Sequence, residues 1–384
     1  MRIFVAAALA VVAAPALSAE PPVVQWTGAY ARFSNAGGNC VAQTSDGGYI
    51  VCGGTDSVLG YPHFYLVRVS TNGSVLWDTV YTGTVGDAQF VTETNDGGFV
   101  LAGESDGLAY VMRTTATGSV VWSGDVGANA TGRSYSIAQT QDSGYVVGGV
   151  LAGNLPVLGW VRGMAVVKLT AQGTVSWRAV LSEDYGDEDA YVRVVQASDG
   201  GFVVAGRSGT QGLRLAKLST TGGVVWERTY PVEDVGDGRS LQQTSDGGFI
   251  VTGGAAADAP DPGYTGDLYL LKADSLGYLK WVKKFGGCDV DEGRFVSQTS
   301  DGGFVVAGLT RSDANADFDG YIVRTNASGV ELWSKTIGVE GRFDEANCVR
   351  QTTDGGFAIA GMGFFNPATD TVFMFLQKLA PESQ

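Results

Sequence analysis

Three observations predict an all-β fold for this chain, a seven-bladed β-propeller of four-stranded antiparallel blades. A phrase typified by QTSDGGF returns seven times along the 384 residues, and such self-similarity indicates a repeat architecture. Seven of the eight tryptophans recur in step with the phrase. No stretch within the repeat keeps a helical apolar spacing over three turns. The repeats are therefore expected to close into one domain around an axis.

The fifth repeat illustrates the four strands expected in each blade. Residues 240–244 and 249–252 are two short β patterns joined by an Asp-Gly-Gly turn, in which glycine tolerates the positive φ that a hairpin requires. After a variable loop, a third strand is expected at 268–272. A second tight turn at 274–277 leads into a fourth strand that carries Trp281. The unit is an antiparallel sheet of four strands.

The two ends of the chain provide a mechanism for closing the ring. The first strand, residues 23–30, carries Trp26 but has no preceding partner, whereas the last strand, residues 371–378, lacks a Trp-bearing strand after it. We therefore expect the N-terminal strand to complete the seventh blade, which removes the open junction between the ends. A linear β-solenoid competes with this architecture, but solenoid repeats are shorter and do not alternate two hairpin turns with long variable loops.

The repeated residues are interpreted as structural. A buried indole fills a large volume between packed sheets, and an aspartate in a tight turn accepts hydrogen bonds from backbone N–H groups. The tryptophans are Trp26, Trp77, Trp122, Trp177, Trp226, Trp281 and Trp333, and the turn aspartates are Asp46, Asp96, Asp142, Asp199, Asp246, Asp301 and Asp354. Three residues before each aspartate stands a glutamine or glutamate, which is expected on a sheet face where it needs a partner: Gln43, Glu93, Gln139, Gln196, Gln243, Gln298 and Gln351.

Two stretches, Lys217 to Trp226 and Arg324 to Trp333, carry a family resemblance. They resemble the tryptophan-docking repeat of pyrroloquinoline-quinone-type propellers. The whole unit is more similar to the repeats of roughly fifty residues in secreted bacterial and archaeal propellers. This likeness covers essentially all of residues 22–380 and implies the propeller fold. It implies no activity and no cofactor, because the quinone enzymes generally have eight blades and the repeat alone carries no cofactor site.

The N-terminus has the features of a secretory signal. Met1 and Arg2 precede a short apolar run, and small residues follow up to Ala19. Residues 1–19 are therefore expected to be removed, leaving residues 20–384 as a single propeller domain that is secreted or periplasmic. The apolar run is too short to span a bilayer, and no other stretch is long and apolar enough to do so. Three Asn-x-Ser/Thr triplets matter only if the source glycosylates exported proteins.

Composition excludes several functions. A net charge of −15 argues against a nucleic acid or an anionic membrane as partner, since both require a positive surface. A single histidine, His63, removes most Ser-His-Asp, Cys-His and multi-histidine zinc chemistry.

Function is expected where the repeats differ, in the loops at one end of the ring, which we call the irregular face. Acidic residues crowd its blade-connecting segments, whereas blades one and three contribute Tyr61, His63, Phe64 and Trp160. We expect a non-enzymatic binding or scaffold protein that uses this face for a protein, a glycan or a cation. The alternative is a carbohydrate-active enzyme, a hydrolase or lyase, with paired carboxylates on that face. The connecting segments hold Glu183, Asp184, Asp187, Glu188, Asp189, Glu233, Asp234, Asp237, Asp289, Asp291, Glu292, Glu340, Asp344 and Glu345, and loops within blades add Asp258, Asp261, Asp267, Asp313, Asp317 and Asp319.

The densest acidic cluster suggests a calcium loop. Asp313, Asn315, Asp317 and Asp319 alternate along the chain, and Ca²⁺ requires six to eight converging oxygens. The cluster departs from the EF-hand because Asn326 stands where its final glutamate belongs, and from the nine-residue propeller calcium loop because Val323 replaces an acid. A solvated acidic loop is the alternative interpretation. No other cofactor is expected.

Four cysteines in an exported chain allow three disulfide pairings. Cys40 and Cys52 flank the Asp46 turn at equal distance, so they are expected to face each other across one hairpin. Cys288 lies before the sixth repeat, and Cys348 occupies in the seventh repeat the position of Cys40. The preferred set is Cys40 with Cys52 and Cys288 with Cys348, although geometry can exclude either pair.

Overall fold

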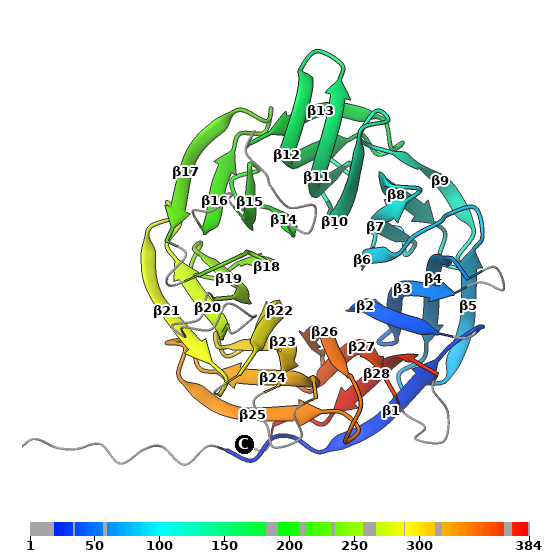
Figure 1. The fold of residues 1–384 in the computed structure, drawn as a ribbon, viewed down its shortest axis with the longest axis vertical. Helices are drawn as coiled ribbons and strands as arrows, with labels where there is room; N and C mark the ends of the chain where they lie inside the picture. The colour runs from blue at the N-terminus through cyan, green and yellow to red at the C-terminus, as the bar shows by residue number, and fades with distance from the viewer. Residues whose placement is uncertain are drawn as a thin grey trace, which may run out of the picture.

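The computed structural model describes residues 19–33, 35–56, 60–181, 191–207, 212–231, 235–255, 266–287, 289–311, 317–364 and 371–382. These residues form 28 β-strands and, within the described ranges, no helix. Figure 1 shows the strands as short sheets arranged in a ring around a central axis. The predicted all-β class is confirmed, and five sheets have the predicted four antiparallel strands. The sheets of blades 2 and 3 are joined into one of eight strands by a single pair, Thr131 opposite Leu108.

The 28 strands fit seven blades of four, which we number in chain order. Blade 1 holds β2 (Ala36–Gln43), β3 (Tyr49–Asp56), β4 (Pro62–Val69) and β5 (Val75–Tyr81); blade 2 holds β6 (Ala88–Glu93), β7 (Phe99–Ser105), β8 (Leu108–Thr114) and β9 (Val120–Asp125); blade 3 holds β10 (Thr131–Gln139), β11 (Tyr145–Leu155), β12 (Gly159–Leu169) and β13 (Val175–Val180); blade 4 holds β14 (Val192–Gln196), β15 (Phe202–Arg207), β16 (Leu213–Leu218) and β17 (Val224–Tyr230). Blade 5 holds β18 (Ser240–Gln243), β19 (Phe249–Gly254), β20 (Leu268–Ala273) and β21 (Leu279–Phe285); blade 6 holds β22 (Asp291–Gln298), β23 (Phe304–Thr310), β24 (Asp319–Thr325) and β25 (Glu331–Ile337); blade 7 holds β26 (Glu345–Gln351), β27 (Phe357–Gly363), β28 (Phe373–Leu379) and β1 (Val24–Tyr30).

Burial explains the order of strands within a blade. The first strand of each blade lies nearest the axis in Figure 1. The second and third strands, such as β19 and β20 of blade 5, are almost entirely buried, because neighbouring blades cover both of their faces. The fourth strand, such as β21, is exposed or half-buried along most of its length. The core therefore lies between the sheets, and the first strands line the centre of the ring.

The N-terminal strand completes blade 7. β1 pairs antiparallel with β28 from Val24 opposite Leu379 to Tyr30 opposite Met374, the pairing that the sequence predicts. Two segments that lie about 350 residues apart in the sequence are thereby neighbours in one sheet. Of the expected signal segment, residues 1–18 lie outside the described residues. In the described part of the chain, no helix is long and apolar enough to cross a membrane.

Each periodic tryptophan packs against the next blade. Its ring contacts the aromatic residue that opens the second strand of that blade, with ring centroids 5.5 to 6.2 Å apart, and six of the seven also cover the glycine of that blade's second tight turn. A Cβ on Gly73, for example, would lie 2.7 Å from an atom of Trp26. The pairs are Trp26–Tyr49, Trp77–Phe99, Trp122–Tyr145, Trp177–Phe202, Trp226–Phe249, Trp281–Phe304 and Trp333–Phe357.

We predict that tryptophans in the series contribute far more to stability than the one outside it. Trp333 is 2% exposed and its indole donates to Glu382 at 2.7 Å, so Trp333→Ala should lower the free energy of unfolding by about 3–5 kcal/mol. Trp160 is 73% exposed, and Trp160→Ala should change it by less than about 0.5 kcal/mol. Urea unfolding followed by circular dichroism measures both. Similar losses for the two variants would contradict the assignment.

Candidate functional site

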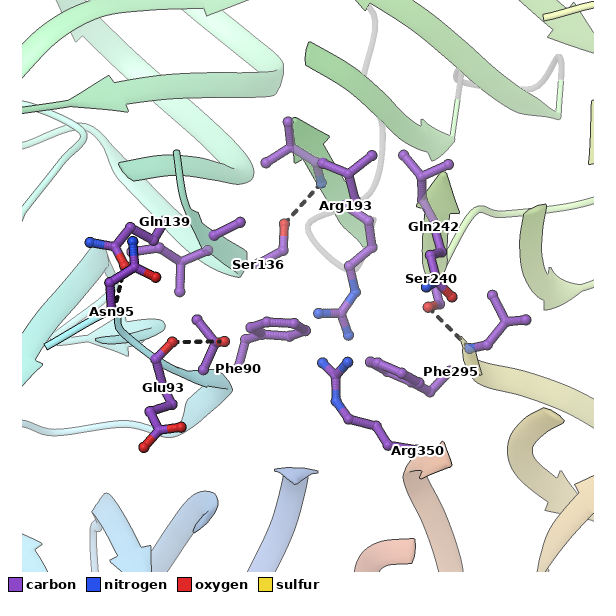
Figure 2. Close-up of a pocket in the computed structure, with 17 residues that line it drawn as sticks. Phe90, Glu93, Asn95, Ser136, Gln139, Arg193, Ser240, Gln242, Phe295 and Arg350 are labelled. Atoms are coloured by element: carbon purple, nitrogen blue, oxygen red, sulfur yellow. Dashed lines mark hydrogen bonds between the residues drawn. The ribbon is translucent and has the colours of Figure 1, made fainter. Parts of the chain in front are cut away.

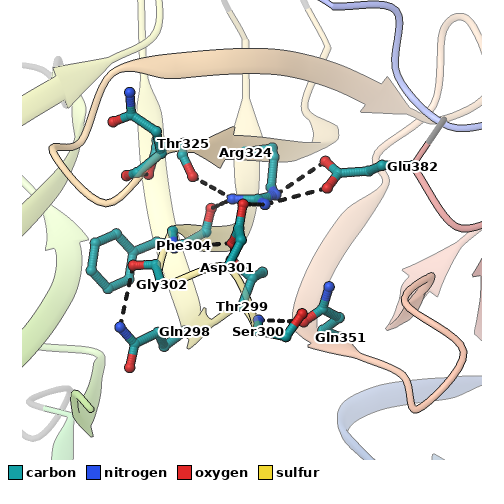
Figure 3. A network of polar contacts seen from close by, with 12 residues as sticks. Gln298, Thr299, Ser300, Asp301, Gly302, Phe304, Arg324, Thr325, Gln351 and Glu382 are labelled. Carbon is teal, nitrogen blue, oxygen red and sulfur yellow. Dashed lines mark hydrogen bonds and ion pairs between the residues drawn. The ribbon is translucent and has the colours of Figure 1, made fainter. Parts of the chain in front are cut away.

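The turn aspartates organise one end of the ring, which we call the regular face. Figure 3 shows the arrangement in blade 6. One carboxylate oxygen of Asp301 accepts from the hydroxyl of Thr299 at 2.6 Å and from the backbone N–H of Gly303 at 3.1 Å. The other accepts from Arg324 at 2.7 Å. The aspartate therefore closes its own turn and binds a cation from the third strand of the same blade.

The same ion pair occurs in all seven blades. In each case the basic side chain is buried to at least nine-tenths whereas the carboxylate is about half exposed or more. The buried cation thus reaches out of the sheet to a partner on the surface, as snorkelling side chains do. The pairs are Asp46–Arg68, Asp96–Arg113, Asp142–Lys168, Asp199–Lys217, Asp246–Lys272, Asp301–Arg324 and Asp354–Lys378.

The repeated glutamine or glutamate supplies a bond between blades. Its side-chain oxygen accepts the N–H of the residue before the turn aspartate in the preceding blade, at 2.7 to 2.9 Å. Figure 3 includes one such bond, from Ser300 to Gln351. The last bond runs from Thr353 of blade 7 to Gln43 of blade 1 at 2.8 Å. The complete series is Ser45–Glu93, Asn95–Gln139, Gln141–Gln196, Ser198–Gln243, Ser245–Gln298, Ser300–Gln351 and Thr353–Gln43.

The described part of the irregular face carries less unpaired negative charge than the sequence suggests. Several of the acidic residues assigned to it bind arginines of the same molecule, so these carboxylates are already neutralised. Asp344 instead accepts the backbone N–H groups of Val339 and Phe364 at 2.8 and 2.9 Å. The ion pairs are Asp237 and Glu292 with Arg239, Asp289 with Arg311, and Glu345 with Arg294.

The remaining acidic residues of this face include Glu183, Asp184, Asp187, Glu188, Asp189, Glu233, Asp234, Asp258, Asp261 and Asp313, which lie outside the described residues. Of the expected calcium ligands, Asp313 and Asn315 are among the residues that are not described, Asp317 is half-buried and Asp319 is buried. Within the described ranges, no group of three or more His, Cys, Asp or Glu side chains is placed to hold a metal ion.

The enzyme alternative requires two carboxyls near the axis, one of them with a raised pKa. Burial raises the pKa of Asp87, with Glu104 adding to the effect and Arg133 opposing it. Burial also raises the pKa of Asp344. Neither residue lines the central cavity described below. Glu104 is engaged by Arg133 at 2.6 Å.

The cysteines differ from the predicted pairing. Cys40 and Cys52 are directly opposite in the β2–β3 ladder, but the structure holds both as free thiols, together with Cys348. The Cys52 sulfur lies 3.7 Å from the carbonyl oxygen of Ala88, whereas the sulfurs of Cys40 and Cys348 are 3.7 Å apart across the junction of blades 1 and 7. Cys288, the expected partner of Cys348, lies outside the described residues.

A central cavity of about 350 Å³ lies on the axis toward the regular face. Its walls are the first strands of blades 2 to 7, and Figure 2 shows Arg193 of β14 and Arg350 of β26 approaching each other inside it, beside Phe90 of β6 and Phe295 of β22. The two phenyl rings are stacked, with centroids 6.4 Å apart and planes at 25°. A smaller cavity of about 40 Å³ shares Arg193 and is lined by Tyr191, Arg239, Arg294 and three amide side chains.

The sequence did not predict this cavity, because differences between the repeats were expected to carry function only in the loops. The signal lies in the first strands instead. The position of Arg193 holds Cys40, Phe90, Ser136, Ser240, Phe295 and Cys348 in the other repeats, and that of Arg350 holds Ala42, Thr92, Ala138, Val195, Gln242 and Ser297. Each arginine thus occurs once in its seven equivalent positions.

Comparison with known proteins supports the fold. The chain is similar to the WD40 domain of Pan2 from Neurospora crassa, with 11% identity, a TM-score of 0.56, and 91% of each chain covered. It is also similar to Sqt1 from Chaetomium thermophilum, with 13% identity, a TM-score of 0.54, and coverage of 89% of this chain and 82% of that one. No family model and no curated protein matches the sequence. The chain therefore shares the β-propeller fold of these domains.

The turn aspartates predict a loss of stability in acid. Hydrogen bonds and the neighbouring cations lower the pKa of all seven against the opposing effect of burial, to about 2 for Asp142 and Asp246. A depressed folded-state pKa contributes stability that is present above the unfolded value of about 3.9 and is lost as the pH falls toward about 2. The urea midpoint should therefore fall over this window, and less so in Asp142→Asn with Asp246→Asn. A urea midpoint that does not change between pH 5 and pH 2 would refute this prediction.

The thiol geometry predicts which disulfide an oxidant produces. A disulfide requires a sulfur separation of about 2.05 Å, and Cys40 and Cys348 need only a modest approach to reach it. Burial raises the pKa of Cys52 and Cys348 well above the usual value, so the oxidant should be present during refolding. Peptide mapping without reduction should then recover Cys40 linked to Cys348. Recovery of Cys40 linked to Cys52 would contradict this prediction.

Proposed function

We propose that this chain is an exported, non-enzymatic scaffold: a closed seven-bladed propeller whose irregular face binds a protein partner. Three features support the proposal. The N-terminal sequence has the pattern of a secretory signal, the repeat resembles those of secreted propellers, and the fold is similar to WD40 propellers, an architecture that we take as a platform for protein binding.

The observation that carries the proposal is an extended hairpin in blade 3. β11 and β12 have 11 residues each, and their pairing continues to Leu155 opposite Gly159. Figure 1 shows the hairpin projecting beyond the rim of the ring. The tip of the hairpin is the loop between the second and third strands of blade 3, so it lies at the irregular face.

The tip of this hairpin is apolar and exposed. Trp160 is 73% exposed, and Val157 and Leu158 also face solvent. Val157 has a φ of 73°, which a β-branched residue rarely adopts, and such strain is often retained where a segment contacts a ligand. An exposed aromatic flanked by aliphatic residues is typical of the anchor of a protein interface. Of the other distinctive side chains at this face, His63 and Phe64 are buried, while Tyr61 is exposed.

The acidic loops of the irregular face form the rest of the proposed partner surface. Because the described carboxylates largely bind internal arginines, the proposal rests on the apolar hairpin and assigns charge a role in orienting the partner. A protein partner is favoured over a glycan or a cation because the exposed hairpin is apolar and the described carboxylates largely bind internal arginines.

We predict that the hairpin variant Leu158→Ser with Trp160→Ser loses partner binding while remaining folded. Tagged chains would be exported from the source cells, cross-linked and purified, and the co-purified proteins quantified by mass spectrometry. A partner recovered with the unaltered chain should fall at least tenfold with the hairpin variant, since a central aromatic anchor is worth about 2 kcal/mol or more.

Val225→Ser is the matched control. Val225 is 61% exposed on the outer strand of blade 4, so the substitution removes a similar exposed apolar group elsewhere and should leave recovery unchanged. Equal recovery with all three chains would reject the hairpin as the contact, provided that their melting temperatures agree.

A further inference from the structure

Two arginines inside the central cavity have unused hydrogen-bond donors. The Nε of Arg350 donates to the carbonyl oxygen of Val41 at 2.8 Å. Arg193 donates from Nε to Arg239 and from Nη1 to Tyr135, both backbone carbonyl oxygens, at 2.7 and 2.5 Å. Within the described part of the chain, the other guanidinium N–H groups have no protein acceptor, and neither arginine is in an ion pair. Figure 2 shows these free ends directed toward one another.

Aromatic rings hold the two guanidiniums in place. The central carbon of the Arg193 guanidinium lies 5.1 Å from the centroid of Phe90, and that of Arg350 lies 4.9 Å from the centroid of Phe295. Cation–π contacts of this kind orient a guanidinium, but they supply no acceptor for its N–H groups. The donors remain available to a molecule that enters the cavity.

The adjacent smaller cavity provides an internal comparison. Its two further arginines are both neutralised: Arg239 binds Asp237 and Glu292, and Arg294 binds Glu345 at 2.7 Å. Arg239 directly precedes β18 of blade 5 and Arg294 lies on β22 of blade 6, so the protein provides carboxylate partners for the arginines of the two blades between those of Arg193 and Arg350. The absence of such partners around Arg193 and Arg350, among the described residues, is specific to the larger cavity.

Three other polar side chains of the larger cavity already have hydrogen-bond partners. Ser136 accepts from the backbone N–H of Val194 at 3.0 Å, and Ser240 accepts from that of Val296 at 3.1 Å. Glu93 is the one carboxylate among the described lining residues, and it accepts both the N–H and the hydroxyl of Ser45. The lining thus offers guanidinium donors and aromatic surface to a ligand, with no free carboxylate to oppose an anion.

Arg193 is buried beside Arg350, and two neighbouring cations, one of them buried, are unfavourable unless an anion compensates them. Burial lowers the pKa of Arg193, and the charge of Arg350 lowers it further, while the Cys40 and Cys348 thiols oppose the effect. The repeat does not require either arginine, since six of the seven equivalent positions hold other residues. A cavity of about 350 Å³ also lies within the usual range for small-molecule sites.

We propose that the central cavity binds a small organic oxyanion, a carboxylate or phosphate on an apolar body, through Arg193 and Arg350, with Phe90 and Phe295 contacting the apolar part. Arginine is suited to this role because its planar donors match the oxygens of both groups. The site lies at the opposite end of the ring from the hairpin of blade 3. The proposal is therefore independent of the protein partner.

Phenyl phosphate and benzoate are the probes, and isothermal titration at low ionic strength is the measurement. The unaltered chain should bind at least one of them with one site per chain, and its melting temperature should rise with the probe but not with sodium chloride of equal ionic strength. Comparison of the two probes distinguishes phosphate from carboxylate. Inorganic phosphate should bind more weakly than phenyl phosphate, since it lacks the part that contacts the phenylalanines.

Arg350→Gln tests the assignment, because a lost charged hydrogen bond should weaken binding about tenfold or more. Arg350→Lys should retain part of the affinity. The matched control is Arg228→Gln, which removes an arginine that stacks on Tyr278 outside the cavity, with 4.4 Å between its guanidinium carbon and the ring centroid, and it should bind as the unaltered chain does. The proposal is overturned if neither probe binds the unaltered chain, or if folded Arg350→Gln binds as tightly.

Discussion

The contact between one blade and the next is the interaction on which the rest of this structure depends. Each contact combines a tryptophan packed on the aromatic residue of the following blade with a glutamine or glutamate oxygen that accepts a turn N–H of the preceding blade. Because every contact joins neighbours, the arrangement is complete only where Trp26 meets Tyr49 and Thr353 meets Gln43. β1 therefore joins blade 7, through its pairing with β28, to blade 1, through the indole of Trp26.

The same contacts hold the central cavity in shape. Gln351 follows directly after Arg350, and Gln196 lies three residues after Arg193, on the first strands of their blades. A hydrogen bond that fixes the end of each first strand therefore fixes the direction in which the neighbouring arginine enters the cavity. The ion pairs of the turn aspartates support this end of the ring from within each blade. A rigid frame is what a preformed binding site requires.

Repetition explains how much the sequence could predict. The strands and the turns follow from local patterns that recur seven times, so a chance match at one repeat does not mislead, and the completion of blade 7 by β1 follows from the strands left unpartnered at the two ends. The partner of each glutamine or glutamate was not predictable, because it lies in another blade, 44 to 55 residues away in the sequence for six of them and 310 residues away for Gln43. The Cys40–Cys52 pairing considered only one hairpin, whereas the ring places Cys348 beside Cys40 from 308 residues away. The charge of the acidic face was not predictable either, because Glu292 and Glu345 bind arginines of the neighbouring blades 5 and 6, more than fifty residues earlier in the sequence.

The cavity arginines illustrate the same limit and explain how an acidic chain can offer an anion site. Net charge acts over the whole surface, where ions screen it beyond a Debye length of about 8 Å at physiological salt. Inside the cavity, charges are screened less than at the surface, so two neighbouring guanidiniums outweigh carboxylates that are distant or already hydrogen-bonded. Amino-acid composition gives the net charge of the whole chain but not the local charge inside the cavity. The sign of a binding site is therefore determined by which charges the fold leaves unpaired, and among the described residues that line this cavity those are Arg193 and Arg350.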